Sequence, residues 1–507
     1  MNTTSGINRM RKKIILWGII LSMLYCCNYY RKGGAFDAII NEYSKNIKDS
    51  IERESAIFLK ENMKDIMSDK VNFYDDHFKE IELSLDEFKS EASLLSFMGK
   101  KKLDYEMCVV PDTQIVTAIY LKNNIKYAIN SWNKYPWCKN IPKNIFLNYL
   151  LPYKVFQEYP QEWRQYFFSK YKDSIDVALK RYQYDSADIY AIDPNELYYR
   201  IVVDDAGKWY KYSDFFVKLT QYPSLSELLC IGKGSCSETS ILNVYILRSL
   251  GIPAAVDIVP VWGSKNGSHT SEVFWDGKNK MRTASGREFE RPTKVFRLSF
   301  KKQNYWNDSV SLFVDRENFM LPYLMNNHWI DVTEEHTKTV DINVLIDTLI
   351  LPDFAYICVY NYGQWQPAFW GKIENKKAEF KKMGYPMIYR IAVPDRTGFA
   401  LLNKILLVDE DGKLNYIGPT KENIKHIVLE KTNAGEKSYV QQQNVYELFL
   451  LDERSQWISL GKKKCLRDSL ITFSNVPQNA LLRLVNIAGK KNLERIFTYQ
   501  NNKQVWW

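Results

Sequence analysis

Cys236 stands where the sequence predicts the start of a helix, and it is the side chain in the chain whose position most clearly indicates chemistry. Gly232 and Gly234 interrupt the segment before it, and apolar residues follow at close to helical spacing until Gly251. A thiol in the first turn of a helix faces backbone N–H groups without intrahelical partners and the positive end of the helix dipole. Because both stabilise a thiolate, the pattern predicts a nucleophilic cysteine.

A histidine follows at the start of a predicted strand. Residues 254–262 have the β-branched and aromatic composition of one strand, and His269 opens a second that ends at Trp275. Residues 276–279 are typical of a hairpin turn. The order of helix, strand and second strand can bring a histidine at the start of that second strand to the beginning of the helix. We therefore expect the imidazole of His269 to lie roughly 3 to 4 Å from the thiol of Cys236.

A thiol hydrolase also needs a group that fixes the tautomer and angle of the imidazole. With the turn at 276–279, the residue opposite His269 is Gly286 or a close neighbour, and no aspartate stands there. Ser285 and Glu288 are the nearest polar side chains, so Ser285 Oγ or a backbone carbonyl of its strand is the expected acceptor. A neutral acceptor stabilises imidazolium less than a carboxylate does, which predicts a thiol pKa near the unperturbed value of about 8.5.

Three short motifs together resemble the transglutaminase-like core of the papain-like cysteine hydrolases. They are the residues 234–236 that open the helix, 250–254 that close it, and 268–270 on the strand, and the resemblance covers about residues 222–300. It implies an α+β core in which Cys236 is the nucleophile and His269 the general base. The aspartate that this family places on the adjacent strand is missing from the expected position. No metal and no organic cofactor are implied.

Two functional classes are consistent with these residues. In the first, Cys236 attacks a peptide or carboxamide carbonyl and His269 passes the proton to the leaving amine, which makes the protein a cysteine peptidase or amidase; an amine acceptor would make it a cross-linking enzyme. In the second, the fold is kept without turnover and holds a peptide or a glycan. The missing aspartate favours the second class, whereas the presence of both Cys236 and His269 favours the first. Without the resemblance, a small buried cysteine and a structural histidine would be the simpler interpretation.

The N-terminus has the pattern of an export signal. Basic residues at positions 9–13 precede an apolar run at 14–25, which is too short to span a bilayer, and Cys26 and Cys27 follow directly. This arrangement resembles a bacterial lipoprotein signal, in which Cys27 would be lipidated and become the mature N-terminus. An uncleaved anchor is the alternative. Either interpretation places the protein at the bacterial cell envelope, attached to a membrane and outside the cytoplasm.

The remaining cysteines and the charge balance exclude several classes. Cys108, Cys138, Cys230, Cys236, Cys358 and Cys465 show no CxxC spacing, so neither a disulfide framework nor a zinc site is predicted, although Cys230 and Cys236 could pair. The net charge is +10 over 507 residues, with acidic and basic residues interspersed. Together with an export signal, this makes nucleic acid an unexpected partner.

The chain is predicted to be a multidomain α+β protein. We expect a signal peptide at 1–27, a helical N-terminal region at 28–220, the transglutaminase-like core at 221–335, and two β domains at 336–410 and 411–507. Amphipathic patterns predict helices at 36–63, 118–132 and 162–179, and strand patterns begin at Trp329. Residues 150–154 also resemble a segment of larger envelope proteins that carry this core. The many aromatic residues of the β domains are typical of a sheet core, with a carbohydrate groove as the alternative.

Overall fold

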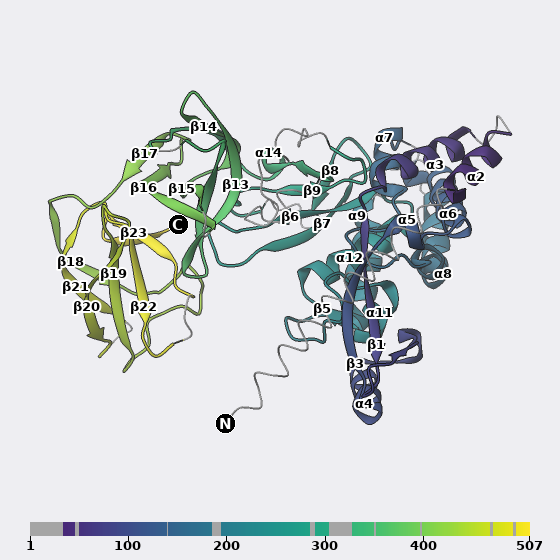
Figure 1. The fold of residues 1–507 in the computed structure, drawn as a ribbon, viewed down its shortest axis with the longest axis horizontal. Coiled ribbons are helices and arrows are strands. Elements are labelled where there is room, and N and C mark those ends of the chain that lie inside the picture. The colour runs from purple at the N-terminus through teal and green to yellow at the C-terminus, as the bar shows by residue number, and fades with distance from the viewer. Residues whose placement is uncertain are drawn as a thin grey trace. The chain divides into compact units, whose positions relative to one another are not determined.

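The computed structural model describes residues 34–45, 50–138, 140–184, 194–283, 289–303, 327–348, 351–395, 398–466, 470–489 and 493–507. The protein is a mixed α+β, multidomain chain with β-sheets towards its C-terminus. It divides into two compact units (Figure 1): unit 1 contains residues up to 254 together with 274–280, and unit 2 contains 255–273 and 281–507. The domain boundaries at 220, 335 and 410 stay predictions.

Unit 1 is built mainly from helices. Those with at least ten residues are α2 (Gly34–Tyr43), α3 (Ser50–Asn62), α4 (Glu91–Lys101), α6 (Ala118–Lys134), α8 (Trp163–Tyr184) and α12 (Cys236–Ser249). The shorter helical segments are η2 (Leu85–Glu87), α5 (Asp112–Ile115), η3 (Pro136–Cys138), α7 (Lys143–Ile145), η4 (Phe146–Leu150), α9 (Pro194–Leu197), η5 (Tyr198–Ala206), α10 (Gly207–Trp209) and α11 (Leu225–Ile231). The helices predicted at 36–63, 118–132 and 162–179 are confirmed, the first as the pair α2 and α3.

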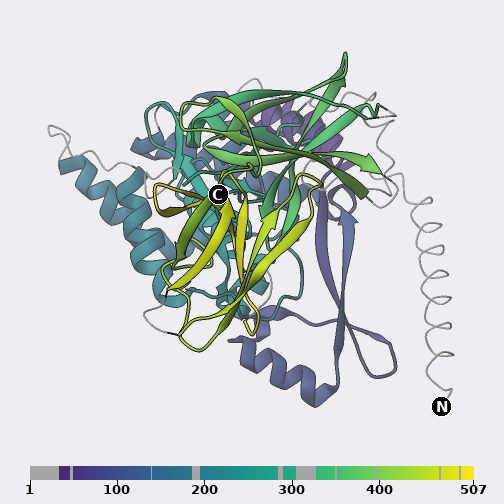
Figure 2. The same cartoon turned by 90° about the vertical axis from the view of Figure 1, so that its left-hand side faces the viewer.

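A three-stranded antiparallel sheet in unit 1 was not predicted. It has the order β2-β1-β3, with β1 at Met67–Tyr74, β2 at Glu80–Ile81 and β3 at Asp104–Pro111. Figure 2 shows β1 and β3 as a long ribbon that reaches towards α4. Most residues of β3 are exposed, so neither of its faces gives the apolar and polar alternation by which a strand is predicted. A second small pairing, parallel, joins β4 (Lys211–Tyr212) to β5 (Lys233–Gly234).

Two buried arginines connect residues 149–154 with the long helices. Arg248, near the end of α12, donates from Nε to the carbonyl of Tyr149 at 2.9 Å and from Nη1 to those of Pro152 and Lys154 at 3.2 and 2.8 Å. Arg164 of α8 donates from Nη2 to the carbonyls of residues 150, 151 and 152. Buried carbonyls need such donors where the backbone is irregular. Residues 150–154, which the sequence analysis noted, therefore connect α8 and α12 through hydrogen bonds to these two arginines.

Lys154 carries a buried positive charge that Asp112 balances. The side chain of Lys154 is 2% exposed and that of Asp112 is fully buried. Nζ of Lys154 lies 3.0 Å from Oδ2 of Asp112 and 2.6 Å from Oγ of Ser68, and Tyr153 donates to the same carboxylate at 2.6 Å. A buried ion pair is tolerated when hydrogen bonds also satisfy the two charged groups, as they do here.

A second buried carboxylate holds the middle of α12. Glu158 accepts hydrogen bonds from the hydroxyl of Tyr245 at 2.7 Å and from the backbone N–H groups of Val155 and Phe156. Tyr245 lies on α12, and its ring stacks on Trp163 of α8 with 4.6 Å between centroids. The helix that begins with Cys236 is thus fixed by Tyr245 and, near its end, by Arg248.

The five-stranded sheet that follows α12 has the order β10-β9-β6-β7-β8. Its strands are β6 (Ala254–Val259), β7 (His269–Trp275), β8 (Met281–Thr283), β9 (Phe296–Leu298) and β10 (Trp329–Asp331). The strand after the helix, the position of His269 at the start of the next strand and the turn at 276–279 are confirmed. In that turn, Oδ1 of Asp276 accepts hydrogen bonds from the backbone N–H groups of residues 278, 279 and 280.

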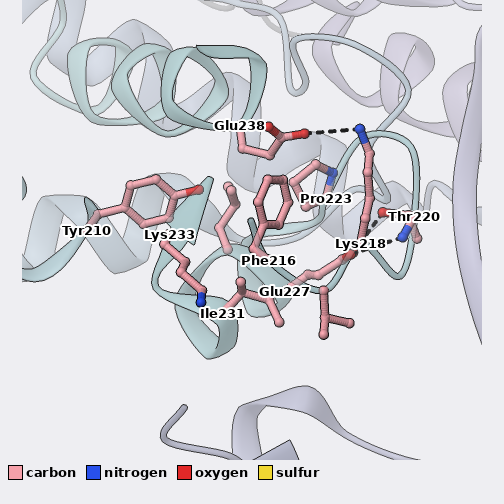
Figure 3. Close-up of a pocket in the computed structure, with 11 residues that line it drawn as sticks. Tyr210, Phe216, Lys218, Thr220, Pro223, Glu227, Ile231, Lys233 and Glu238 are labelled. Atoms are coloured by element: carbon pink, nitrogen blue, oxygen red, sulfur yellow. Dashed lines mark hydrogen bonds and ion pairs between the residues drawn. The ribbon is translucent and has the colours of Figure 1, made fainter. Parts of the chain in front are cut away.

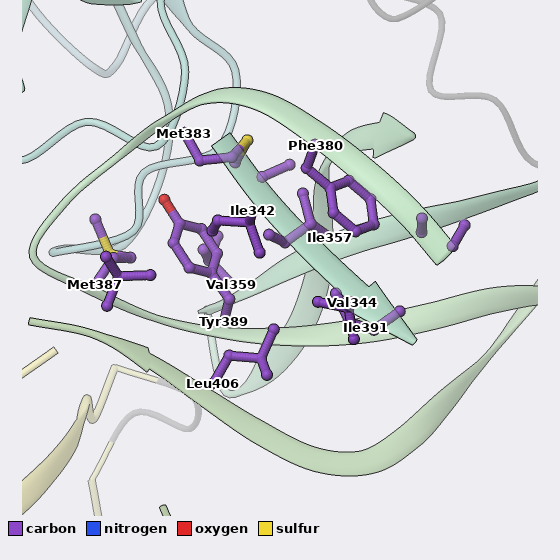
Figure 4. Close-up of a cluster of buried hydrophobic side chains, with 14 of the residues drawn as sticks. Ile342, Val344, Ile357, Val359, Phe380, Met383, Met387, Tyr389, Ile391 and Leu406 are labelled. Carbon is purple, nitrogen blue, oxygen red and sulfur yellow. The ribbon is translucent and has the colours of Figure 1, made fainter. Parts of the chain in front are cut away.

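A seven-stranded antiparallel sheet of order β11-β14-β13-β12-β15-β16-β17 forms much of unit 2. After α14 (Thr333–His336), its strands are β11 (Thr339–Leu345), β12 (Phe354–Asn361), β13 (Gln364–Glu374), β14 (Lys377–Gly384), β15 (Met387–Asp395), β16 (Gly398–Val408) and β17 (Leu414–Ile417). The sheet curves around a core in which Ile357, Val359, Phe380, Tyr389 and Leu406 gather (Figure 4). β12 and β13 form a hairpin in which Tyr360 lies opposite Trp365.

Two further antiparallel sheets complete unit 2. β18 (Asn423–Leu429) pairs with β21 (Ile471–Pro477), and a five-stranded sheet has the order β20-β19-β22-β23-β24. The strands of the five-stranded sheet are β19 (Val445–Leu451), β20 (Trp457–Lys464), β22 (Leu482–Asn486), β23 (Ile496–Gln500) and β24 (Lys503–Trp506). Buried side chains from both sheets form one core, which accounts for much of the apolar sequence after residue 420.

Candidate active site

Cys236 is the first residue of α12, as predicted, and the residue is partly exposed although most of the helix is buried. Ser235 precedes it with an extended backbone, and the Ser235 N–H donates to Oε2 of Glu238 at 3.0 Å. The Ser235 hydroxyl donates to the same oxygen at 2.5 Å. A glutamate at the third helical position that reaches back to the N-cap is a strong start signal. It fixes the residue at which the helix begins, and with it the place of the thiol.

Two glycines shape the backbone before Cys236. Gly232 ends α11 in the left-handed conformation with a φ of 68°, which glycine adopts without steric cost. A Cβ on Gly234 would lie 2.4 Å from the hydroxyl of Tyr210 and 2.4 Å from Cβ of Glu238. The two glycines that predicted the helix start are therefore needed for different reasons. Gly232 adopts a left-handed conformation, and Gly234 leaves room for its close neighbours.

Tyr212 is an aromatic residue whose backbone pairs just before the start of α12. Tyr212 of β4 pairs with Gly234 of β5, two residues before Cys236, and its side chain is largely exposed. The pKa of Tyr212 is raised, first by its hydrogen bond to Asp214 and to a smaller extent by the negative charge that Cys236 would carry. Phe215, which follows on the same segment, is 87% exposed.

A small cavity lies next to the start of α12 (Figure 3). It has a volume of about 10 Å³, room for roughly one water molecule, and Tyr210, Phe216 and Glu238 line it. The ammonium of Lys218 lies 3.3 Å from the Glu238 carboxylate across this cavity. Cys236 does not line this cavity, and a volume of about 10 Å³ is too small to hold a peptide substrate.

His269 lies in unit 2 between aromatic rings. Its partly exposed imidazole contacts Trp262 and Phe289 edge to face, with 5.8 and 5.6 Å between ring centroids. Burial, together with the positive charge of Lys265, lowers the pKa of His269 from 6.5, and Glu272 opposes this change. The imidazole is therefore neutral at neutral pH, the form in which it can accept a proton. Among the residues that the structure describes, none donates to or accepts from its ring nitrogens.

The other predicted site residues lie outside the described part of the chain. Ser285 and Glu288, the expected partners of His269, fall in the gap at 284–288, and Cys27 falls before residue 34. Cys236 belongs to unit 1 and His269 to unit 2. The approach of the imidazole to the thiol and the role of Ser285 therefore stay predictions.

Sequence reasoning missed a buried aspartate in unit 2. Asp257 of β6 is fully buried and accepts hydrogen bonds from Arg297 Nε and Nη2, both at 2.8 Å. Nε2 of His336 lies 2.7 Å from Oδ2 of Asp257, and Arg297 also contacts Glu335 at 2.8 Å. Burial raises the pKa of Asp257, but the charge of Arg297 and the His336 hydrogen bond outweigh it and lower the pKa. The sequence signal for this site was an aspartate inside the apolar segment 254–259, because a buried carboxylate requires a charged partner.

Phe289 lies between the two histidines of this region. Its ring stacks face to face on His336, with 4.5 Å between centroids, and meets His269 edge to face. Asp257 resembles the aspartate of a catalytic triad because it is buried and lies within hydrogen-bond distance of a histidine. That histidine is His336, however, and the carboxylate interacts with His336 and Arg297 rather than with His269.

No protein-family model and no curated protein matches this chain. Among solved structures, the crystal structure of red sea bream transglutaminase is similar to it with a TM-score of 0.20 and 9% sequence identity, over 89% of this chain and 78% of that chain. A TM-score this low establishes neither a shared fold nor a shared activity. The function must be inferred from the residues themselves.

Cofactor and disulfide chemistry can be assessed over the described ranges. All six cysteines there are free, so Cys230 and Cys236 are not paired in this structure. Burial raises the pKa of Cys230 to about 11. No cluster of three or more potential metal ligands occurs in that part of the chain. None of its helices is both long and apolar enough to cross a bilayer.

Proposed function

We propose that this protein is a transglutaminase-like thiol peptidase or amidase with Cys236 as nucleophile and His269 as general base. The observation that supports it best is a partly exposed cysteine at the first residue of a 14-residue helix whose start is fixed by Glu238. Unpaired N–H groups at such a helix start stabilise a thiolate, and later the oxyanion. The other partly exposed cysteine, Cys108, lies on a strand, and burial raises its pKa.

The proposed reaction has two steps. The Cys236 sulfur bonds to the carbonyl carbon of a peptide or carboxamide while neutral His269 takes up the thiol proton. As the tetrahedral intermediate collapses, the carbon–nitrogen bond breaks and His269 returns the proton to the leaving amine, which leaves an acyl thioester. Water, deprotonated by His269, then cleaves the thioester and restores the thiol. Neither step uses a metal or an organic cofactor.

The second candidate is a peptide- or glycan-binding protein that has kept the fold without turnover. A specific observation favours it: the buried carboxylate of Asp257 interacts with His336 and Arg297, and no described residue forms a hydrogen bond with the His269 ring. A triad that lacks its orienting acid loses several orders of magnitude in rate.

A peptidyl vinyl sulfone probe separates these candidates. We expect it to label the purified protein at one site, and peptide mapping should place the adduct on Cys236. Cys236→Ala should abolish labelling, whereas Cys108→Ala, the matched control at the other partly exposed cysteine, should retain it. Labelling that survives in Cys236→Ala would contradict the proposed nucleophile. An unlabelled wild-type protein that still binds peptides would support the second candidate.

We also propose that the protein is a lipoprotein of the bacterial cell envelope, anchored through Cys27, with a peptide or protein as its substrate. The support is the basic, apolar and cysteine pattern of residues 9–27. A fatty-acid analogue fed to expressing bacteria should label the wild-type protein, and Cys27→Ser should abolish the label. Labelling lost only in Cys26→Ser would move the anchor by one residue, and labelling retained in the double variant would contradict the proposal.

A further inference from the structure

A cavity of about 420 Å³ opens between α6, α8 and the end of α12, within unit 1. We call it the arginine pocket, because Arg164 and Arg248 line it together with Tyr127, Asn130, Phe168 and Ser249. Its volume is that of a small-molecule site. Ser249 lies 13 residues along α12 from Cys236, which corresponds to roughly 20 Å at about 1.5 Å per residue. The arginine pocket is therefore separate from the candidate active site.

No described carboxylate lines the arginine pocket or forms an ion pair with its two arginines. Arg164 and Arg248 are each 3% exposed, and neither forms an ion pair with any described carboxylate. Lys134 also lines the pocket, and no acidic residue does. Buried charges are costly unless they are paired, and here backbone carbonyls supply only dipoles. Burial and the repulsion from Arg248 lower the pKa of Arg164, and the charge of Glu162 opposes this. Burial lowers the pKa of Arg248 to about 10, although the charge of Glu158 opposes it.

The same two guanidinium groups retain unused donors. Arg248 donates from Nε and Nη1, and within the described chain Nη2 donates to no acceptor. Nη1 of Arg164 makes a single hydrogen bond, of 3.3 Å, to the carbonyl of Arg248. The hydroxyl of Tyr135, which also lines the pocket, is buried and has no partner among the described residues. A planar oxyanion is the group that such forked donors bind best.

Aromatic side chains form the rest of the arginine pocket. The rings of Tyr127 and Phe168 lie 6.3 Å apart and tilted by 48°, and Tyr135 adds a third ring. A bare inorganic ion would leave these rings without contacts. We propose that the arginine pocket binds a small organic anion that has a carboxylate or phosphate head and an apolar or aromatic body. The head would contact Arg164 and Arg248, and the body would lie against Tyr127 and Phe168.

Thermal unfolding of the full chain, dialysed free of oxyanions, tests this binding site with benzoate as the probe. Benzoate at about ten times its Kd should raise Tm by roughly 2–4 °C. Benzamide, which has the same shape without the charge, should not. Phenyl phosphate should act like benzoate if the natural head is a phosphate, and more weakly if it is a carboxylate. Inorganic phosphate should have a smaller effect than either aromatic anion.

Variants at the rim of the arginine pocket make the test specific without disturbing the buried arginines. Asn130→Asp places a carboxylate in the pocket, so it should abolish the benzoate shift while the protein stays folded. The matched control Asn144→Asp, at an exposed position that does not line the pocket, should keep the full shift. An absent shift in the wild-type protein, an equal shift with benzamide, or a shift that Asn130→Asp leaves unchanged would each overturn the proposal.

Discussion

Asp112→Asn is expected to lower the free energy of unfolding by about 3–5 kcal/mol. In the wild-type protein, the Asp112 carboxylate lies 3.0 Å from the ammonium of Lys154, and both side chains are at most 2% exposed. The amide cannot balance that charge, so the ammonium would remain buried without its counter-ion. Urea unfolding followed by tryptophan fluorescence measures this change in free energy. It is calculated from the unfolding transition whose midpoint shifts in Asp112→Asn.

The matched control combines Asp112→Asn with Lys154→Met. Removing the ammonium as well takes away the uncompensated charge, so the double variant should be less destabilised than the sum of the two single variants. If the double variant is destabilised by as much as the two single variants together, the two side chains do not interact. A loss below about 1 kcal/mol for Asp112→Asn would show that water reaches Lys154.

The local elements of the candidate site could be predicted because their signals are local. Glycine before Cys236, apolar residues at helical spacing and a Gly-Ile-Pro sequence after residue 250 predict α12, and the structure has it at Cys236–Ser249. The composition of residues 254–262 and 269–275 likewise predicts β6 and β7. Each of these elements buries one or more faces continuously, so its pattern is visible in the sequence.

The contacts between distant residues could not be predicted. Nothing next to Arg248 in the sequence shows that it donates to the carbonyls of Tyr149 and Pro152, about a hundred residues earlier. Asp257 lies within the strand predicted at 254–262, but its partners Arg297 and His336 are 40 and 79 residues away. The β1 and β3 pair was missed because neither strand alternates regularly between buried and exposed residues, and most of β3 is exposed.

His269→Ala is expected to slow the acylation of Cys236 by roughly 10²- to 10⁴-fold, the usual contribution of a general base. The lowered pKa of His269 keeps its imidazole neutral at pH 7, so it can take up the thiol proton as the carbon–sulfur bond forms. The burst of nitrophenolate from p-nitrophenyl acetate measures this step. His426→Ala, at an exposed histidine on β18, is the matched control and should leave the rate unchanged.

The pH dependence of that acylation rate, compared between the wild-type protein and His269→Ala, tests the central claim most directly. Burial and Lys265 lower the pKa of His269, so the base is lost by protonation only as the pH falls below 6.5. The wild-type rate should therefore fall along an acid limb below pH 6.5. His269→Ala should lack that acid limb. Superimposable profiles for the two proteins would contradict the pairing of Cys236 with His269.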